Sequence, residues 1–188
     1  MNREEMMKTV KEEMPEKRWR HTLGVMETAV ILARRFGADE EKADRAAILH
    51  DVCKYWPVEK QADAIRESGF QTDVLSFDKE LWHAHAGAWI ASARFGVKDE
   101  DVLNAIRYHT SGRENMSTLE KVVCLADYME PGRDFPGVDK IRELAETSLE
   151  RALLAGFDST LSFLLQKGRR VYPLTVLTRN RLILELDV

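Results

Sequence analysis

The apolar residues of this 188-residue chain recur every three to four positions along most of its length, which is the spacing of one face of an α-helix. No segment alternates apolar and polar positions over four or more residues with the β-branched enrichment of a strand. Glycine and proline fall mostly between the periodic segments. The pattern predicts an all-α fold in one compact domain, residues 1–188, with helices near 2–13, 16–36, 39–53, 58–68, 78–95, 99–109, 117–129, 138–155, 158–167 and 173–186.

Local signals support two of the helix starts and mark three irregular stretches. Asp39 and Asp99 are each followed by two acidic residues, a combination typical of a helix N-terminus. Residues 69–83, 109–118 and 130–139 break the helical pattern. Because binding residues concentrate in such connections, we expect these stretches to border a functional site.

One apolar segment, ADRAAILHDVCKYWP at residues 43–57, carries an imidazole and a carboxylate side by side in a helix whose other positions are typical of a protein core. The pair is His50 and Asp51. Aspartate is among the residues least often buried unless another group pairs with it. The segment therefore raises the question of what pairs with Asp51.

Other imidazoles and carboxylates also fall on inward helical faces. His21 shares a face with Val25 and other apolar residues, and His109 closes a series of apolar positions at helical spacing. Asp127 comes one turn after an inward valine. His83 and His85 are two residues apart, so only one of them can share the inward stripe, and the periodicity does not choose between them.

A single inward histidine is more often a hydrogen-bonded core residue than a ligand, but two inward carboxylates with at least three inward imidazoles are harder to explain in that way. Burying an ionised carboxylate without compensation costs several kcal/mol, and the sequence offers few inward Arg or Lys side chains. One divalent cation would compensate both carboxylates, and neutral imidazoles are its usual companions. The set predicts a metal site.

Composition narrows the class of protein. Hydrophobic residues make up 44% and charged residues 32%, and the net charge is −4. No apolar run approaches the roughly 20 residues that span a bilayer, and the charged start of the chain is unlike a signal peptide. The chain has two cysteines, and neither belongs to a CxxC pair, which is typical of reduced thiols. We expect a cytoplasmic protein that binds neither nucleic acid nor membrane.

The ordered set of His21, the His50–Asp51 pair and Asp127 resembles the HD-domain superfamily of metal-dependent phosphohydrolases. Within it, the chain looks like the YqeK-type family, the bacterial symmetrical bis(5'-nucleosyl)-tetraphosphatases. The resemblance covers nearly the whole chain and rests on RWRHTLGVMETA, AAILHDVCK, LWHAHAGAW, AIRYHTSG, LADYMEPGRDFPGV and RRVYPLTVLTRN. The pair YHTSG and ADYMEPGR at this spacing is its most specific part.

The resemblance implies an all-α HD core at about residues 16–130, with helices over 138–188 completing a nucleotide pocket. It implies a metal, most simply iron, held by His21, His50, Asp51 and Asp127, although Mn, Co, Ni or another divalent ion would also suit these ligands. It favours His83 over His85, which we interpret as structural, and it puts His83 and His109 beside the phosphates or on a second metal.

The implied activity is symmetrical hydrolysis of diadenosine tetraphosphate to two ADP, and the residue types fit it. Asp51 can ligate the metal and hold the attacking water, and a metal makes that water a nucleophile near neutral pH. His109, if protonated, would assist the leaving phosphate. Together with His83 and Lys54, these are the expected catalytic residues.

Polyphosphate also requires cationic and hydrogen-bonding contacts. Helical spacing puts Arg18 one turn before His21 and Lys54 one turn after His50, beside the metal ligands. Arg133 follows Asp127 on a loop, and Arg169 is paired with Arg170 before Tyr172, which offers an aromatic face. The expected nucleotide contacts are Arg18, Lys54, His83, His109, Thr110, Arg133, Arg170, Val171, Tyr172 and Pro173.

Two other functions stay open at this point. One is a nucleotidase or nucleoside polyphosphate hydrolase on the same fold, and the other is a nucleotide-binding regulator that keeps the metal for structure only. Serine or cysteine nucleophilic catalysis and Gly-rich phosphate loops have no motif in the chain. The apolar run LTVLTRNRLILELDV at the end of the sequence would suit a homodimer.

Overall fold

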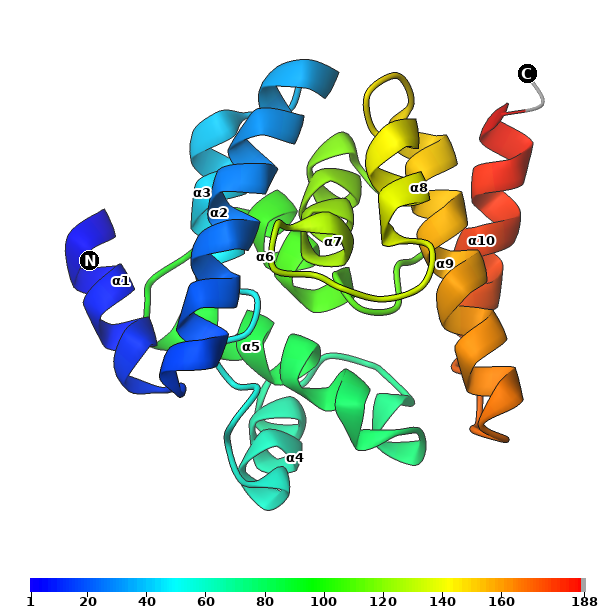
Figure 1. The fold of residues 1–188 in the computed structure, drawn as a ribbon. Coiled ribbons are helices and arrows are strands. Elements are labelled where there is room, and N and C mark those ends of the chain that lie inside the picture. Colours follow the sequence, from blue (N-terminus) through cyan, green and yellow to red (C-terminus); the bar gives the residue numbers. More distant parts are fainter. Residues whose placement is uncertain (187–188) are drawn as a thin grey trace.

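A computed structural model describes residues 1–186, and all regular structure within them is helical, as predicted (Figure 1). The last two residues of the apolar C-terminal run and of the predicted domain lie outside the described range. The helices are α1 (Arg3–Glu12), α2 (Glu16–Phe36), α3 (Glu40–Leu49), α4 (Val58–Glu67), α5 (Trp82–Ala93), α6 (Glu100–Tyr108), α7 (Thr118–Met129), α8 (Val138–Leu144), α9 (Leu149–Gln166) and α10 (Pro173–Leu186), with short 3-10 helices η1 (Val74–Ser76) and η2 (Lys79–Leu81).

Side-chain caps define several helix starts. Asp39 accepts a hydrogen bond from the Lys42 amide at the start of α3, and Asp99 does the same for two amides of α6. Ser117 forms a capping box with Glu120 at the start of α7. Each cap satisfies amides that have no partner inside the helix, so these starts follow from local sequence.

Helix α7 occupies the middle of the molecule, with α2 and α3 on one side and α8 and α9 on the other (Figure 1). It also packs against α6, which in turn packs against α5. Completely enclosed side chains such as Leu32, Ile106, Leu125 and Phe157 join these helices into one hydrophobic core. The core therefore holds the ends of α2, α3, α5, α6 and α7 close together.

Helix α3 ends earlier than predicted. The helix stops at Leu49, and residues 50–55 form a series of turns. His50 and Asp51 therefore stand at the end of a helix instead of in its middle, on backbone that is held in place by the enclosed side chains around it.

The predicted helices 138–155 and 158–167 are wrong. The break falls at residues 145–148, where Ser148 caps α9, and α9 then runs without interruption through Gly156. A β-carbon at Gly156 would lie 3.1 Å from Cδ2 of the Tyr128 ring. Gly156 allows α9 to pack closely on α7 and does not end a helix.

Within residues 1–186, none of the helices combines the length and the apolar character needed to cross a bilayer.

Candidate metal centre

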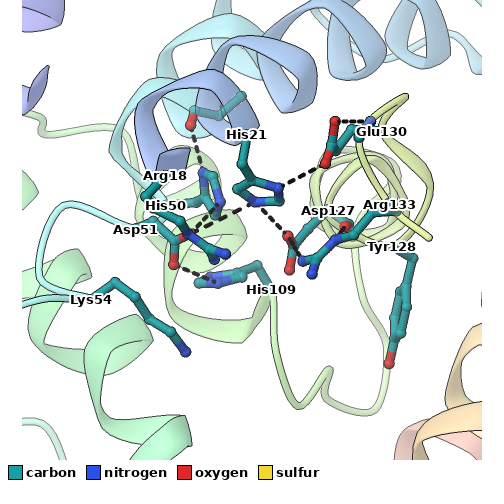
Figure 2. A network of polar contacts seen from close by, with 12 residues as sticks. Arg18, His21, His50, Asp51, Lys54, His109, Asp127, Tyr128, Glu130 and Arg133 are labelled. Carbon is teal, nitrogen blue, oxygen red and sulfur yellow. Dashed lines mark hydrogen bonds and ion pairs between the residues drawn. The ribbon is translucent and has the colours of Figure 1, made fainter. Parts of the chain in front are cut away.

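Imidazoles from four parts of the chain meet around one buried carboxylate (Figure 2). His21 comes from α2, the His50–Asp51 pair from the turn after α3, His83 from α5, and His109 from the end of α6. The side chains of His50, Asp51 and His109 have no exposed surface, and that of His83 is 2% exposed. The structure thus brings together predicted residues that are up to 88 positions apart in sequence, the separation of His21 and His109.

Hydrogen bonds at the far side of the rings orient three of these imidazoles. The Nδ1 atom of His50 lies 2.6 Å from the Ala47 carbonyl, and that of His109 lies 2.8 Å from the Ile106 carbonyl. The Nδ1 atom of His21 lies 3.0 Å from Oε1 of Glu130. A carbonyl or carboxylate requires the proton on Nδ1, so each ring presents the lone pair of Nε2 to the interior, as metal-binding histidines do.

Asp51 faces these lone pairs, and its oxygens also lie next to Arg18 and His83. Both of its oxygens are buried and accept no well-formed hydrogen bond, and Nε2 of His21 and Nε2 of His50 are also unpaired. The distance from His50 Nε2 to Asp51 Oδ2 is 3.0 Å, and that from His21 Nε2 to the same oxygen is 3.8 Å. Two donor atoms roughly 2.1 Å from one metal ion and at right angles to each other lie about 3.0 Å apart. The residues therefore fit a divalent cation.

The donor atoms form two groups that share Asp51. The first comprises His21, His50 and Asp51, and the second comprises Asp51, His83 and His109; within each group the ligand atoms lie within 4.8 Å of one another. Oδ2 of Asp51 faces the first group, and Oδ1 faces the second, 3.1 Å from His83 Nε2. The geometry provides one site for a metal and a neighbouring site for a second metal or a phosphate.

Asp127 stands at the edge of the first group. Its Oδ1 lies 3.0 Å from His21 Nε2, and the Arg133 guanidinium pairs with the same oxygen. The pKa of Asp127 is held well below its usual range because Arg133 and His21 outweigh the effect of burial. The carboxylate is thus ionised and adjacent to the cluster, although it is bound to Arg133 in this conformation.

Two arginines neutralise the inward carboxylates, so the expectation of few inward cations is wrong. Arg18, one turn before His21 on α2, reaches Oδ2 of Asp51 with its Nη2, and its side chain is 17% exposed. Arg133 does the same for Asp127 from the loop after α7. Arg133 lies on irregular backbone, so no periodicity indicated its direction. The two guanidinium groups lie beside the candidate metal ligands, Arg18 at Asp51 and Arg133 at Asp127 (Figure 2).

Lys54 lies beside the second group. Its Nζ is 3.5 Å from Nδ1 of His83 and 2.8 Å from Oε2 of Glu80, which belongs to η2. An ammonium group can only donate, so Nδ1 of His83 is the acceptor and the proton of this ring belongs on Nε2, facing Asp51. In this conformation Lys54 favours the tautomer in which His83 donates to Asp51.

Burial keeps two of the imidazoles neutral. It lowers the pKa of His109 to about 3, with the neighbouring His50 and His83 rings acting in the same direction. Burial also lowers the pKa of His83, although Asp51 opposes the shift. Neutral imidazoles are the form that binds metals. The suggestion of a protonated His109 at neutral pH is therefore not supported by its surroundings.

His85 is buried as well, on the other side of α5. Its side chain lies near Phe70 and Tyr108, with ring centroids 6.3 and 6.0 Å away, and makes no contact with the cluster. His83 alone of the two points at Asp51. Of the two histidines, the structure thus places His83 in the cluster and His85 outside it.

Two cavities adjoin the cluster. The α9 cavity, about 620 Å³, is lined by His109, Thr110, Asp127 and Arg133 at its inner end and by Phe135, Phe163 and Gln166 farther out. The α2 cavity, about 940 Å³, is lined by Lys17, Arg18, Arg20 and His21 of α2, by Tyr55, and by Glu130, Arg133 and Phe135. Arg133 and Phe135 belong to both, so the two cavities flank the loop after α7.

The segment predicted to contact nucleotide at residues 169–173 packs against residues 73–78 instead of against the cluster. The Arg170 guanidinium lies 4.9 Å from the Phe77 ring centroid, and Arg169 is 3.4 Å from Asp78. Tyr172 is 4% exposed and donates a hydrogen bond to Asp73. The Tyr172 ring is therefore packed inside the protein, against Phe77. Val171 is half-buried, and Pro173 begins α10.

Sequence reasoning missed Glu130. Its carboxylate accepts hydrogen bonds from His21 and, at 2.6 Å, from the Gly132 amide. A β-carbon on Gly24 of α2 would lie 2.4 Å from Oε2 of Glu130, so a larger residue there would displace this carboxylate. The only signal in the sequence is its position three residues after Asp127, which alone does not distinguish it from a solvent-exposed glutamate.

Comparisons with known proteins agree with this geometry. The model of the HD domain family matches residues 18–132. Proteins named symmetrical bis(5'-nucleosyl)-tetraphosphatase from Bacillus subtilis and Halalkalibacterium halodurans are 50% and 48% identical, over 97% and 98% of this chain and 98% and 99% of theirs. A crystal structure of a predicted HD superfamily hydrolase involved in NAD metabolism from Clostridium acetobutylicum is 41% identical, with a TM-score of 0.94 and 98% of each chain covered.

The matched region contains the cluster residues from Arg18 to Asp127 and its neighbours up to Gly132. HD domains are metal-dependent, and the buried His and Asp donors described above provide a place for the metal. The chain therefore belongs to the HD-domain family, and within it to the family of the symmetrical bis(5'-nucleosyl)-tetraphosphatases.

Proposed function

We propose that the protein is a metal-dependent hydrolase that cleaves diadenosine tetraphosphate symmetrically into two molecules of ADP. The observation that carries the proposal is the fully buried carboxylate of Asp51, which faces imidazole lone pairs on one side and has the basic side chain of Arg18 next to it. The relatives with this printed activity match the chain over nearly its full length. A phosphoric anhydride is the bond class that such a site hydrolyses.

We propose iron as the metal, held by His21, His50, Asp51 and Asp127. Imidazole and carboxylate donors suit several divalent ions, and the likeness to this family favours iron among them. When bound, a divalent metal polarises phosphoryl oxygens and lowers the pKa of coordinated water toward neutrality. Elemental analysis of the purified protein tests the identity of the metal and the number of ions per chain.

The protein's own groups orient the reaction. Oδ1 of Asp51 is directed away from the first group of ligands and accepts a proton from the attacking water or holds it in line. His83 keeps its proton on Nε2, which lies 3.2 Å from Nε2 of His109. This N–H group donates a hydrogen bond to the phosphate oxygen that carries charge in the transition state. His109 stays neutral and acts as an acceptor or a ligand.

Arg18, Lys54 and Arg133 bind the phosphates. Each of them is paired with a carboxylate of the protein in this structure, and phosphate oxygens would replace those partners when substrate binds. Thr110, at the inner end of the α9 cavity, offers a hydroxyl to the same phosphates. Arg170, Val171, Tyr172 and Pro173 would contact the nucleoside only from the outer end of the site, through their exposed or backbone atoms.

Turnover of the Asp51→Asn variant tests the proposal. Asparagine keeps the shape of the side chain but removes the charge that binds the metal and the water, so we expect turnover of diadenosine tetraphosphate to fall by a factor of about 10³ or more. Asp63→Asn, on the exposed face of α4, is the matched control and should turn over normally. Equal turnover by both variants would exclude this role for Asp51. Monophosphates or inorganic phosphate as products would indicate a nucleotidase instead.

The cytoplasmic location and the absence of nucleic-acid partners stay predictions. Cys53 and Cys124 are buried free thiols, which suits a reducing compartment. Helix α10 exposes Val176, Leu177 and Leu184, an apolar surface that supports the proposed homodimer.

A further inference from the structure

The α2 cavity reaches the cluster on one particular side of Asp51. Arg18 and His21, which line its inner end, face Oδ2 of Asp51, whereas His83 and Lys54 lie on the side of Oδ1. The cavity is larger than the α9 cavity, at about 940 Å³ against about 620 Å³. Its size and position give it direct access to the reacting centre.

The charges that line the α2 cavity suit a polyanion. Lys17, Arg18, Arg20 and Arg133 bring four basic groups to its wall, and Glu27, Glu130 and Asp134 bring three acidic ones. Of these acids, the carboxylate of Glu130 is already engaged by His21 and by the Gly132 amide. Nε of Arg18 is buried and has no hydrogen-bond partner within residues 1–186. A donor is therefore available at the inner end of the cavity.

An exposed aromatic ring stands at the rim of the cavity. Tyr55, in the turn that follows Asp51, is 56% exposed, and Phe135 lines the cavity from the loop after α7. A large aromatic side chain held in solvent next to a basic pocket is a typical platform for a nucleobase. The cavity thus combines groups for phosphate at its inner end with a surface for a base at its outer end.

Symmetrical cleavage requires that two equal halves extend in different directions from the reacting phosphates. We infer that the α2 cavity binds the second nucleoside diphosphate half of the substrate, with Tyr55 stacked on its base and Arg18 and Arg20 on its phosphates. The inference rests on the proposed function, and it leaves the side of Lys54, His83 and Thr110 for the other half. Arg133, which borders both cavities, lies between the two halves.

Calorimetric titration of the metal-loaded protein with ADP, the proposed product, tests this inference without turnover. The wild-type chain should bind two ADP molecules, one in each half-site. Tyr55→Ala should weaken one of the two sites about fivefold to a hundredfold, the range expected for the loss of one base–aromatic contact. Tyr55→Phe keeps the ring and should keep the affinity.

A pair of double variants tests the charges. Lys17→Ala with Arg20→Ala removes two positive charges from the cavity and should weaken the same site as Tyr55→Ala. Lys8→Ala with Lys11→Ala removes the same charge from the exposed surface of α1 and should leave both sites unchanged.

One ADP per wild-type chain would overturn the inference, as would two sites that Tyr55→Ala does not affect. Equal weakening of the second site by both double variants would show a general effect of charge and would overturn the assignment to this cavity. Failure to release ADP from diadenosine tetraphosphate would contradict the proposed function alone, because the ADP count does not depend on turnover.

Discussion

At the scale of single residues, the direction of each imidazole depends on the hydrogen-bond partner of its outer ring nitrogen. The lone pairs of three imidazoles point inward because carbonyls and one carboxylate hold the opposite ring nitrogen. Glu130 differs from the two carbonyls because it places a carboxylate beside the His21 ring, and such outer partners of metal-binding histidines strengthen metal binding. The residue is therefore expected to influence metal binding without touching the metal.

Glu130→Gln tests this expectation. Glutamine still accepts a hydrogen bond from His21 but lacks the negative charge, so we expect metal affinity to fall roughly 10- to 100-fold. Competition with a chromophoric chelator measures the change. Glu67→Gln, on the exposed surface of α4, serves as the control. Unchanged affinity in Glu130→Gln would mean that the contact only positions the loop.

His85 gives the protein a pH dependence that is separate from the cluster. Burial, with the Arg107 charge acting in the same direction, lowers the pKa of His85 to about 3. The unfolded chain, with a histidine pKa of about 6.5, binds this proton at higher pH than the folded chain. Stability is therefore complete above pH 6.5 and is lost as the pH falls from there toward 3.

We expect His85 to account for about 2 kcal/mol of the loss in unfolding free energy between pH 7 and pH 5. Urea unfolding of the wild type and of His85→Phe at both pH values measures it, because the cluster histidines contribute equally to both proteins. Identical losses in the two proteins would show that His85 titrates normally in the folded state.

At the scale of elements, one glycine in α9 and one in α5 differ in the space that each has for a side chain. A β-carbon at Gly156 would press against the Tyr128 ring at 3.1 to 3.2 Å, whereas at Gly87 its nearest contact would be an ordinary 3.5 Å. Alanine favours a helix over glycine by about 1 kcal/mol where space allows. Gly156 is thus required by packing, and Gly87 is not.

The two glycine-to-alanine substitutions should therefore change stability in opposite directions. Gly156→Ala should lower the unfolding free energy by about 1–2 kcal/mol, because overpacking outweighs the gain in helix propensity. Gly87→Ala should raise it by about 0.5–1 kcal/mol. Denaturant unfolding measures both. Stabilisation by Gly156→Ala would show that α9 moves easily away from α7.

The elements also show which features a sequence can predict. Helix starts at Asp39, Asp99 and Ser117 depend on neighbours within three residues, and the inward direction of His21 and His109 depends on periodicity. These follow from local physics, and the all-α fold follows with them. The start of α9 also has a local signal, because Ser148 accepts a hydrogen bond from the Arg151 amide, whereas the end of α3 at Leu49 has no capping residue that marks it.

The candidate site divides in the same way. The convergence of His21, His50 and His109 on Asp51 was predictable because each lies on an apolar face. The reach of Arg133 and the partnership of Glu130 with His21 come from a loop that has no periodicity. Tyr172 packs against the 73–78 segment, and its hydrogen bond to Asp73 joins residues 99 positions apart. No local sequence pattern indicates this contact.

At the scale of the whole molecule, the donor groups connect α2, α5, α6, α7 and the turn after α3. A metal that binds only the folded chain adds to its stability by mass action. We expect chelation to lower the unfolding free energy by about 3–4 kcal/mol when the metal is supplied at 100 to 1,000 times its dissociation constant. Calorimetric melting with and without chelator measures it, and equal melting temperatures would contradict a metal held by the fold.

The central claim is symmetrical, metal-dependent cleavage, and the mass spectrum of the nucleotides formed from diadenosine tetraphosphate in ¹⁸O-labelled water tests it most directly. One water enters per cleavage at an inner phosphorus atom. The account predicts ADP as the only nucleotide product, with one ADP molecule in two carrying a single ¹⁸O on its β-phosphate. AMP together with ATP, labelled inorganic phosphate, or no product from the metal-loaded protein would contradict it.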